Sequence, residues 1–251
     1  MRFSANLGFL WAELSLPAAI HAAKAAGFQA VECHWPYATP AIELLAALDE
    51  TGLEMLALNT RRGNPGENGL AALPGREEDA RAAIKEALEY AIVTRTPCVH
   101  VMAGFAVGPD AEATFVENLR FASALARPHG LTILIEPLNR HDAPGYFLTT
   151  TDHARDIIGQ VAAQNLQLMF DCYHVQRTEG DVTHRLADLL PIIGHIQFAS
   201  VPDRGPPDRG ELNYSHVFRV ISELGYASPL GAEYKPKGPT ELSLSWMTAF
   251  R

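Results

Sequence analysis

The stretch TILIEPLNRHDAPGYFLTTTDHARDIIGQVAAQNLQLMFD, residues 132–171, contains two short apolar runs with a helical pattern between them. The runs Thr132 to Pro137 and Gln167 to Asp171 have the length and composition of buried strands. From Thr151 to Ala163 the apolar residues instead recur at helical spacing. Strand, helix and strand in this order predict a parallel βαβ unit.

The same alternation continues along the chain in both directions. Further strands are expected at Phe3–Leu7, Ala30–His34, Glu54–Asn59, Cys98–Met102, His195–Phe198 and Leu230–Tyr234. Further helices are expected at Leu16–Ala26, Pro40–Glu50, Glu77–Ile92, Ala111–Arg127, Val182–Leu190, Tyr214–Leu224 and from Glu241 onward. Eight strand–helix units in 251 residues match one (β/α)8 barrel. We therefore predict an α/β fold, a TIM barrel that forms a single domain over residues 1–251.

Glycine marks the ends of several predicted helices. Gly27, Gly52, Gly130 and Gly225 follow the last helical turn, where a left-handed residue commonly ends a helix. The competing fold is an open doubly wound sheet, which typically carries a GxGxxG turn before its first helix. This sequence has no such turn there. The pattern therefore favours the closed barrel.

The charge and composition of the chain indicate which kinds of binding partner are excluded. The formal net charge of -9 argues against a surface that neutralises nucleic-acid phosphates or anionic lipid. No apolar run reaches the ~20 residues of a membrane helix, and Met1 to Leu10 lacks the features of a secretory signal. The three cysteines show no CxxC spacing. We expect a cytoplasmic protein with a small-molecule partner.

Polar residues stand at the ends of four successive predicted strands. They are Glu136, Asp171, Gln197 and Glu233. A single polar residue at a strand end commonly just begins a solvated loop, but neighbouring barrel strands bring such side chains together at the active-site mouth. Three carboxylates in one place would repel one another unless a cation joined them. An all-oxygen set suits Mg2+ or Mn2+, with Co2+ as a substitute.

Other candidate residues surround this predicted site. His174, three residues after Asp171, is expected to hydrogen-bond a substrate oxygen, unless it caps the next helix or packs under the loop. His100 is expected to face the barrel interior. A substrate carboxylate would need an arginine, because the carboxylate ligands leave the site negative. Arg204 is preferred, since it lies closer to Gln197 along the chain, and the alternatives are Arg209, Arg61 and Arg62.

Two features of the rim have open interpretations. The loop Thr60–Gly69 is either a string of turns supplied by Gly, Asn and Pro or a mobile lid. Trp11 and Trp35, near the ends of the first two strands, either line the pocket or form a subunit contact.

Several motifs resemble the hydroxypyruvate isomerase family, within the xylose-isomerase-like barrels that include the ketose 3-epimerases. They are Arg2–Leu7, Leu73–Glu78, Glu117–Arg120, Ile135–Asn139, Asp171–His174, Gly210–Tyr214 and Glu233–Pro236. The resemblance implies that Glu136, Asp171, Gln197 and Glu233 hold the metal. It also implies that Glu136 and Glu233 form the acid/base pair, that Lys235 helps to bind substrate, and that the chain forms a homo-oligomer.

One departure from the family concerns substrate identity. The Asn59–Gly69 segment does not match the family's Pro-rich, Trp-containing loop. The resemblance predicts isomerisation of hydroxypyruvate to tartronate semialdehyde, or of a related 2-oxo acid such as 2-oxo-tetronate, through an enediolate. The alternatives are a keto-sugar 3-epimerase or an inosose-dehydratase-like enzyme on the same metal site, and a barrel that only binds a sugar acid. A DNA-repair nuclease of the same superfamily would need several metals, more His ligands and a basic groove.

Overall fold

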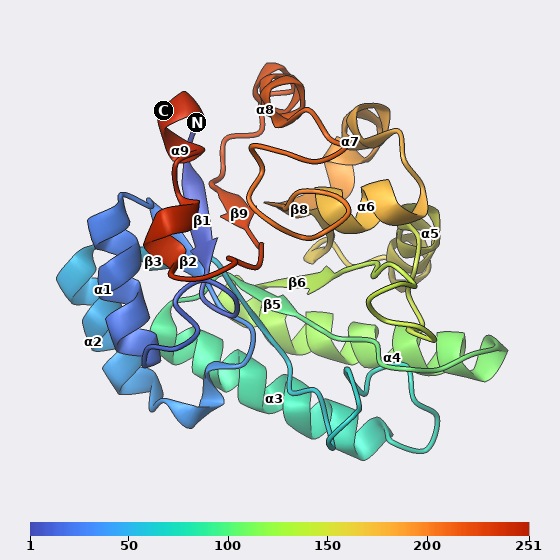
Figure 1. Cartoon of the computed structure of the whole chain (residues 1–251). Coiled ribbons are helices and arrows are strands. Elements are labelled where there is room, and N and C mark those ends of the chain that lie inside the picture. Colours follow the sequence, from blue (N-terminus) through green and yellow to red (C-terminus); the bar gives the residue numbers. More distant parts are fainter. Residues whose placement is uncertain (251) are drawn as a thin grey trace.

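Parallel strands lie side by side and form a central barrel in the computed structural model, which describes residues 1–250 (Figure 1). Their order in the sheet is β3-β2-β1-β9-β8-β7-β6-β5-β4. The strands are β1 Phe3–Asn6, β2 Ala30–Glu32, β3 Glu54–Met55, β4 Ala57–Asn59, β5 Cys98–His100, β6 Thr132–Ile135, β7 Leu166–Asp171, β8 Ile193–Phe198 and β9 Leu230–Ala232. The predicted α/β barrel is thus confirmed.

The third predicted strand is present as two pieces, β3 and β4, which are separated by Leu56. The first piece pairs with β2 and the second with β5. Backbone hydrogen bonds from Cys33 N to Ala57 O (3.1 Å) and from Asn59 N to His34 O (2.8 Å) connect the end of β2 to β4. Because of this break, the segment pairs with β2 through β3 and with β5 through β4, and so it connects the two ends of the sheet.

Helices surround the barrel, as Figure 1 shows. The α-helices are α1 Leu16–Ala26, α2 Ala41–Thr51, α3 Glu77–Thr94, α4 Pro109–Ala126, α5 Thr151–Val161, α6 Cys172–Thr178, α7 Val182–Leu189, α8 Tyr214–Glu223 and α9 Met247–Phe250. The 3-10 turns are η1 Pro36–Ala38, η2 Arg127–His129, η3 Leu190–Ile192 and η4 Thr240–Ser243. The glycines expected to end helices all have positive φ, for example 90° at Gly27 and 79° at Gly225.

Two helical segments differ from the prediction. Helix α6 was not expected, because it follows β7 without an intervening turn: the Asp171 side chain accepts a hydrogen bond from Tyr173 N (2.9 Å) and caps it. The expected helix from Glu241 onward is a 3-10 turn, η4, followed by the short α9. Both differences arise from local hydrogen bonds that hydrophobic spacing does not reveal.

An aromatic cluster joins the last segment to the barrel. Trp246 packs edge-on against Phe3 and Phe198, with ring centroids 4.9 and 5.4 Å apart. Helix α9 accordingly lies close to β1 (Figure 1). Trp11 is 1% exposed and donates its ring N–H to Glu241 (2.6 Å), so it belongs to this packing and to neither of its two predicted roles.

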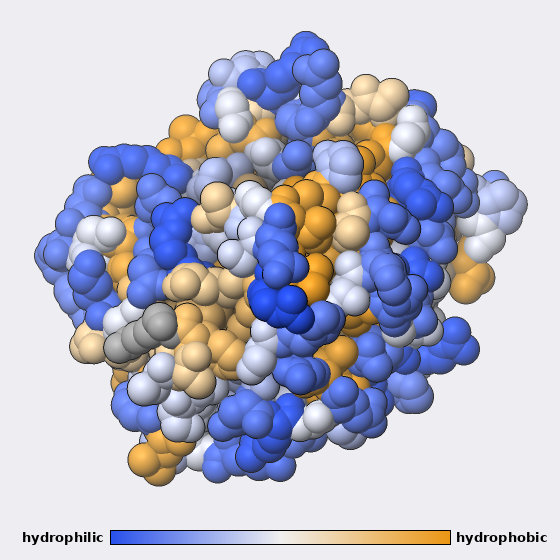
Figure 2. Space-filling view, turned by 90° about the horizontal axis from the view of Figure 1, so that it is seen from above, coloured by the Kyte–Doolittle hydropathy of each residue, from blue (hydrophilic) through white to orange (hydrophobic). Residues whose placement is uncertain are grey.

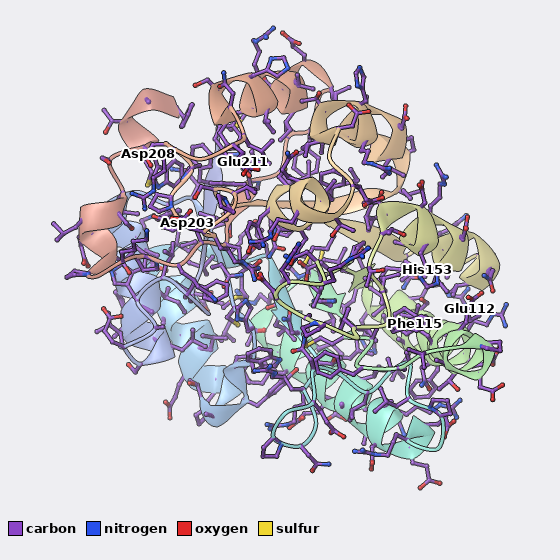
Figure 3. The ribbon with its side chains drawn as sticks, turned by 45° about the vertical axis from the view of Figure 1, so that its right-hand side comes forward. Glu112, Phe115, His153, Asp203, Asp208 and Glu211 are labelled. Carbon is purple, nitrogen blue, oxygen red and sulfur yellow. The ribbon has the colours of Figure 1, made fainter. Side chains whose placement is uncertain are left out.

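The outer face carries mixed polar and apolar areas. Figure 2 shows a largely hydrophilic surface with separate orange areas. In Figure 3 Glu112 and His153 lie together, at 3.6 Å between Oε2 and Nε2, where α4 meets α5. No helix within residues 1–250 is long and apolar enough to cross a bilayer.

Candidate metal centre and active site

The four polar residues at the strand ends meet in space. Glu136 follows β6, Asp171 ends β7, Gln197 lies in β8 and Glu233 follows β9, and these strands are neighbours in the sheet. The register pairs Asp171 with Gln197 directly. Glu136, Asp171 and Glu233, together with His174, each offer an atom within 4.8 Å of the others. All are buried.

A cavity of about 330 Å³ opens onto this cluster. Its wall includes six of the eight predicted site residues, namely Glu136, Glu233, His100, His174, Arg204 and Lys235. The size suits a small acid or sugar rather than a polymer.

Three buried oxygens of the cluster have no hydrogen-bond partner within residues 1–250. They are Glu136 Oε1, Asp171 Oδ2 and Gln197 Oε1. Buried polar atoms are nearly always satisfied in proteins, so such oxygens call for an external group. A hard divalent cation prefers this donor set. The residues present therefore fit a metal such as Mg2+ or Mn2+.

The carboxyl groups differ in their proton affinity. Burial, together with the charges of Glu233 and Asp171, raises the pKa of Glu136 well above its usual value. Burial and the charge of Glu233 raise the pKa of Asp171 to about 8. Burial also opposes ionisation of Glu233, but Arg204 and His34 outweigh it and hold the pKa of Glu233 below its usual value.

Arg204 is the cation closest to the carboxylates. Its Nη2 lies 2.5 Å from Glu233 Oε2 and 3.6 Å from Asp171 Oδ2. The guanidinium group stacks over the rings of Phe9 (4.9 Å) and Tyr173 (5.0 Å). Burial opposes its charge, yet the neighbouring carboxylates raise the pKa of Arg204, so it remains a cation.

Two buried histidines face the cluster in their neutral form. His174 Nδ1 accepts a hydrogen bond from the backbone N–H of Asn139 (3.0 Å). The neutral ring therefore carries its proton on Nε2, which points towards Asp171 Oδ2 (3.6 Å) and Glu136 Oε1 (3.8 Å). Burial and the charge of Arg204 hold the pKa of His174 well below its usual value.

His100 lies on the other side of Glu136. Its Nδ1 is 3.6 Å from Glu136 Oε2, and burial lowers the pKa of His100 to about 4. Both histidines can thus donate one hydrogen bond to a substrate oxygen without adding charge.

The three alternative arginines differ in their position relative to the cavity. Arg61 pairs with Glu86 (2.7 Å between Nη2 and Oε1), away from the cavity, and Arg209 lines a different pocket. Arg62 lines the cavity and stacks over Trp35 (4.9 Å). Within residues 1–250, Arg62 and Lys235 are the cavity-lining cations without a carboxylate partner.

The loop Thr60–Gly69 is fixed to the barrel at its base. Thr60 N donates to His100 O (2.9 Å), and just beyond Gly69 the backbone N–H of Ala71 donates to Met102 O (3.2 Å). A Cβ on Gly69 would lie only 2.4 Å from Met102 O, so the chain passes too close for any other residue. These contacts favour anchored turns over a mobile lid.

Four polar residues of the site were missed by sequence reasoning. His34 Nε2 lies 2.8 Å from Glu233 Oε1, and Asn139 holds His174. Asn6 Nδ2 donates to Glu233 Oε1 (3.1 Å) and to Glu32 Oε1 (2.9 Å), so Asn6 and Glu32 belong to the same network. Three of these residues, His34, Glu32 and Asn6, lie within predicted strands. Their position in a strand could therefore have identified them, as it identified the four strand-end residues.

The family model of the xylose isomerase-like TIM barrels matches residues 20–250. Fold, site and this match define the class, and the chain belongs to this family and, within it, to the hydroxypyruvate isomerase family. It is 46% identical to the 2-oxo-tetronate isomerase of Cupriavidus necator, with 99% of this chain and 98% of the relative covered. It is 39% identical to the hydroxypyruvate isomerase of Escherichia coli K12, with 100% of each chain covered. The chain is therefore an enzyme of the isomerase type.

Solved structures agree on the fold. The crystal structure of a Brucella melitensis protein, described as an AP endonuclease of family 2, matches with a TM-score of 0.96 at 37% identity, over 100% of this chain and 99% of that one. The Escherichia coli 3-keto-D-glucoside 4-epimerase matches with a TM-score of 0.82 at 21% identity, over 98% of each chain, and shares the fold.

Proposed function

We propose that this enzyme interconverts hydroxypyruvate and tartronate semialdehyde, or a related 2-oxo acid such as 2-oxo-tetronate, through an enediolate and with a divalent metal. The observation that carries the proposal is the set of buried, unpartnered oxygens of Glu136, Asp171 and Gln197 beside Glu233. The relatives named as isomerases of these two acids support the choice of substrate class.

Glu136, Asp171, Gln197 and Glu233 would hold the metal, which is Mg2+ or Mn2+, with Co2+ as a substitute. A divalent ion bound there would supply the positive charge that stabilises an enediolate. The net charge of -9 speaks against the alternative of a nucleic-acid substrate.

Glu136 and Glu233 serve as the acid/base pair in this proposal. They extend from β6 and β9, the two outer strands of the four that build the cluster, and both line the cavity. They would therefore reach a bound substrate from two sides, as removal of a proton at one carbon and its return at the next requires.

The remaining residues of the wall bind and orient the substrate. His174 presents its Nε2–H and His100 a neutral ring next to Glu136, where the oxygens of the reacting carbons would lie. Arg204 and Lys235 supply positive charge for the substrate carboxylate. We place the enzyme in the cytoplasm as a homo-oligomer.

Proton NMR of 2-oxo acids and neutral keto sugars in D2O tests the function. Metal-loaded enzyme should introduce deuterium into hydroxypyruvate or 2-oxo-tetronate as product forms, and Glu233→Gln should abolish the exchange while circular dichroism remains unchanged. Exchange confined to neutral sugars would replace the isomerase with a keto-sugar epimerase. Exchange that persists in Glu233→Gln would remove Glu233 from the acid/base pair.

A further inference from the structure

Glu32 is a buried carboxylate on β2, and its side chain is hydrogen-bonded to the candidate metal ligand Gln197. It is 1% exposed and accepts hydrogen bonds from two side-chain amides. Its Oε1 accepts from Asn6 Nδ2 (2.9 Å) and from Gln197 Nε2 (2.8 Å), and its Oε2 contacts His195 Nε2. A buried carboxylate that binds one candidate ligand directly, and a second through Asn6, has a role that packing alone does not explain.

The contact with Gln197 fixes which end of that amide faces the metal cluster. Because Nε2 donates to Glu32, the carbonyl Oε1 points the other way and has no partner among residues 1–250. The reverse orientation would set the carbonyl against the Glu32 carboxylate and turn two N–H groups towards a cation. Glu32 therefore selects the only orientation in which Gln197 can be a ligand.

Asn6 extends the same network to a second ligand. Its Nδ2 lies between Glu32 Oε1 (2.9 Å) and Glu233 Oε1 (3.1 Å). The neighbouring strand leaves room for this arrangement, because a Cβ on Gly231 would lie 2.7 Å from Glu32 Oε1 and 2.8 Å from Gln197 Cγ. One carboxylate is thus connected to two of the four candidate ligands.

We propose that Glu32 is a positioning residue of the metal centre, which holds the Gln197 amide with its oxygen towards the metal and steadies Glu233 through Asn6. The proposal rests on the metal dependence of the proposed function. Residues that orient metal ligands in this way typically change metal affinity by about 10- to 100-fold when they are replaced.

The affinity for Mn2+, measured by EPR of the free ion, tests Glu32 without any substrate. Glu32→Met removes both acceptors at similar volume and should weaken Mn2+ binding about 10- to 100-fold. Glu32→Gln keeps one acceptor for the Gln197 amide and should retain most of the affinity. In a Gln197→Ala background, Glu32→Met should weaken binding by much less, because the residue through which Glu32 mainly acts is gone.

Losses that simply add in the double variant, or unchanged affinity in Glu32→Met, would overturn the proposal. Should Glu32→Met fail to fold, the side-chain NH2 of Gln197 can be followed by 15N NMR in the wild-type protein. Its protons should exchange slowly with water both with and without Mg2+, and rapid exchange in the Mg2+ form would contradict the assigned orientation. Wild-type protein that binds no Mn2+ would instead overturn the metal dependence itself.

Discussion

His34 and Glu233 form a hydrogen-bonded pair, 2.8 Å between Nε2 and Oε1, at the wall of the cavity. The imidazole contacts the rings of Phe9 and Trp35, each with its centroid 5.0 Å away. This contact is one of the causes that hold the pKa of Glu233 below its usual value. The pair thus connects a residue at the rim with a proposed catalytic carboxylate.

Replacing His34 with Phe should move the acid limb of the kcat/KM profile to higher pH. The pKa of Glu233 is lowered in the native site, so removal of a stabilising partner raises it, and the ionised form is lost at a higher pH. His34→Gln retains a donor and serves as the matched control. An unshifted acid limb in His34→Phe would show that ionisation of Glu233 does not limit the reaction.

Glu136→Gln should lower kcat by about 10²- to 10⁴-fold, the usual contribution of a positioned acid or base. The amide keeps the shape of the side chain, so the melting temperature of the metal-free protein should not fall. Initial rates with hydroxypyruvate and 2-oxo-tetronate measure the effect. A variant that retains more than a tenth of the activity would place proton transfer elsewhere.

Metal should stabilise the protein more strongly as the pH rises from 6 to 8.5. The pKa of Asp171 is raised to about 8, and that of Glu136 is raised too. A raised folded-state pKa gives stability at low pH that disappears as the pH passes through that value. The protein in EDTA should therefore melt at lower temperature with increasing pH, and Mg2+ should reverse the loss. A difference between the two melting temperatures that shrinks with pH would contradict this prediction.

Arg62→Gln should raise KM for a 2-oxo acid about fivefold and leave kcat nearly unchanged, because an exposed charge contributes about 1 kcal/mol or less. Arg61→Gln is the matched control, since Arg61 pairs with Glu86 outside the cavity. Higher salt should reduce the difference between wild type and Arg62→Gln. Equal KM values for the two variants would mean that the charge of Arg62 does not attract the substrate.

Gly69→Ala should destabilise the protein by more than about 1 kcal/mol, because φ is +112° and the new Cβ would lie 2.4 Å from Met102 O. Gly66→Ala is the matched control: its φ is +92°, but nothing lies within 4 Å of its Cβ. Urea unfolding of both variants measures the difference. An equal loss of unfolding free energy in both variants would show that the backbone around Gly69 can move to accommodate the new Cβ.

Periodicity was sufficient for the barrel, because each strand and most helices carry their own pattern of burial. The features that periodicity did not predict depend on contacts between segments or on local capping. The break at Leu56 depends on how the strand meets two neighbours, and α6 depends on the Asp171 cap. Strand-end position located Glu136 and Asp171. Glu32 also lies in a predicted strand, but its contacts with Asn6 and Gln197 join three different strands and become visible only in the folded barrel.

The close passage of Gly69 over Met102 has a consequence for how this enzyme can diverge. The chain between Thr60 and Gly69 leaves the barrel and returns to it at two fixed points. Residues 61–68 therefore form a segment that can change as a unit. Two of its residues, Arg62 and Asn68, line the cavity. Changes in this segment can therefore alter the cavity wall while the buried carboxylates at the strand ends keep their places.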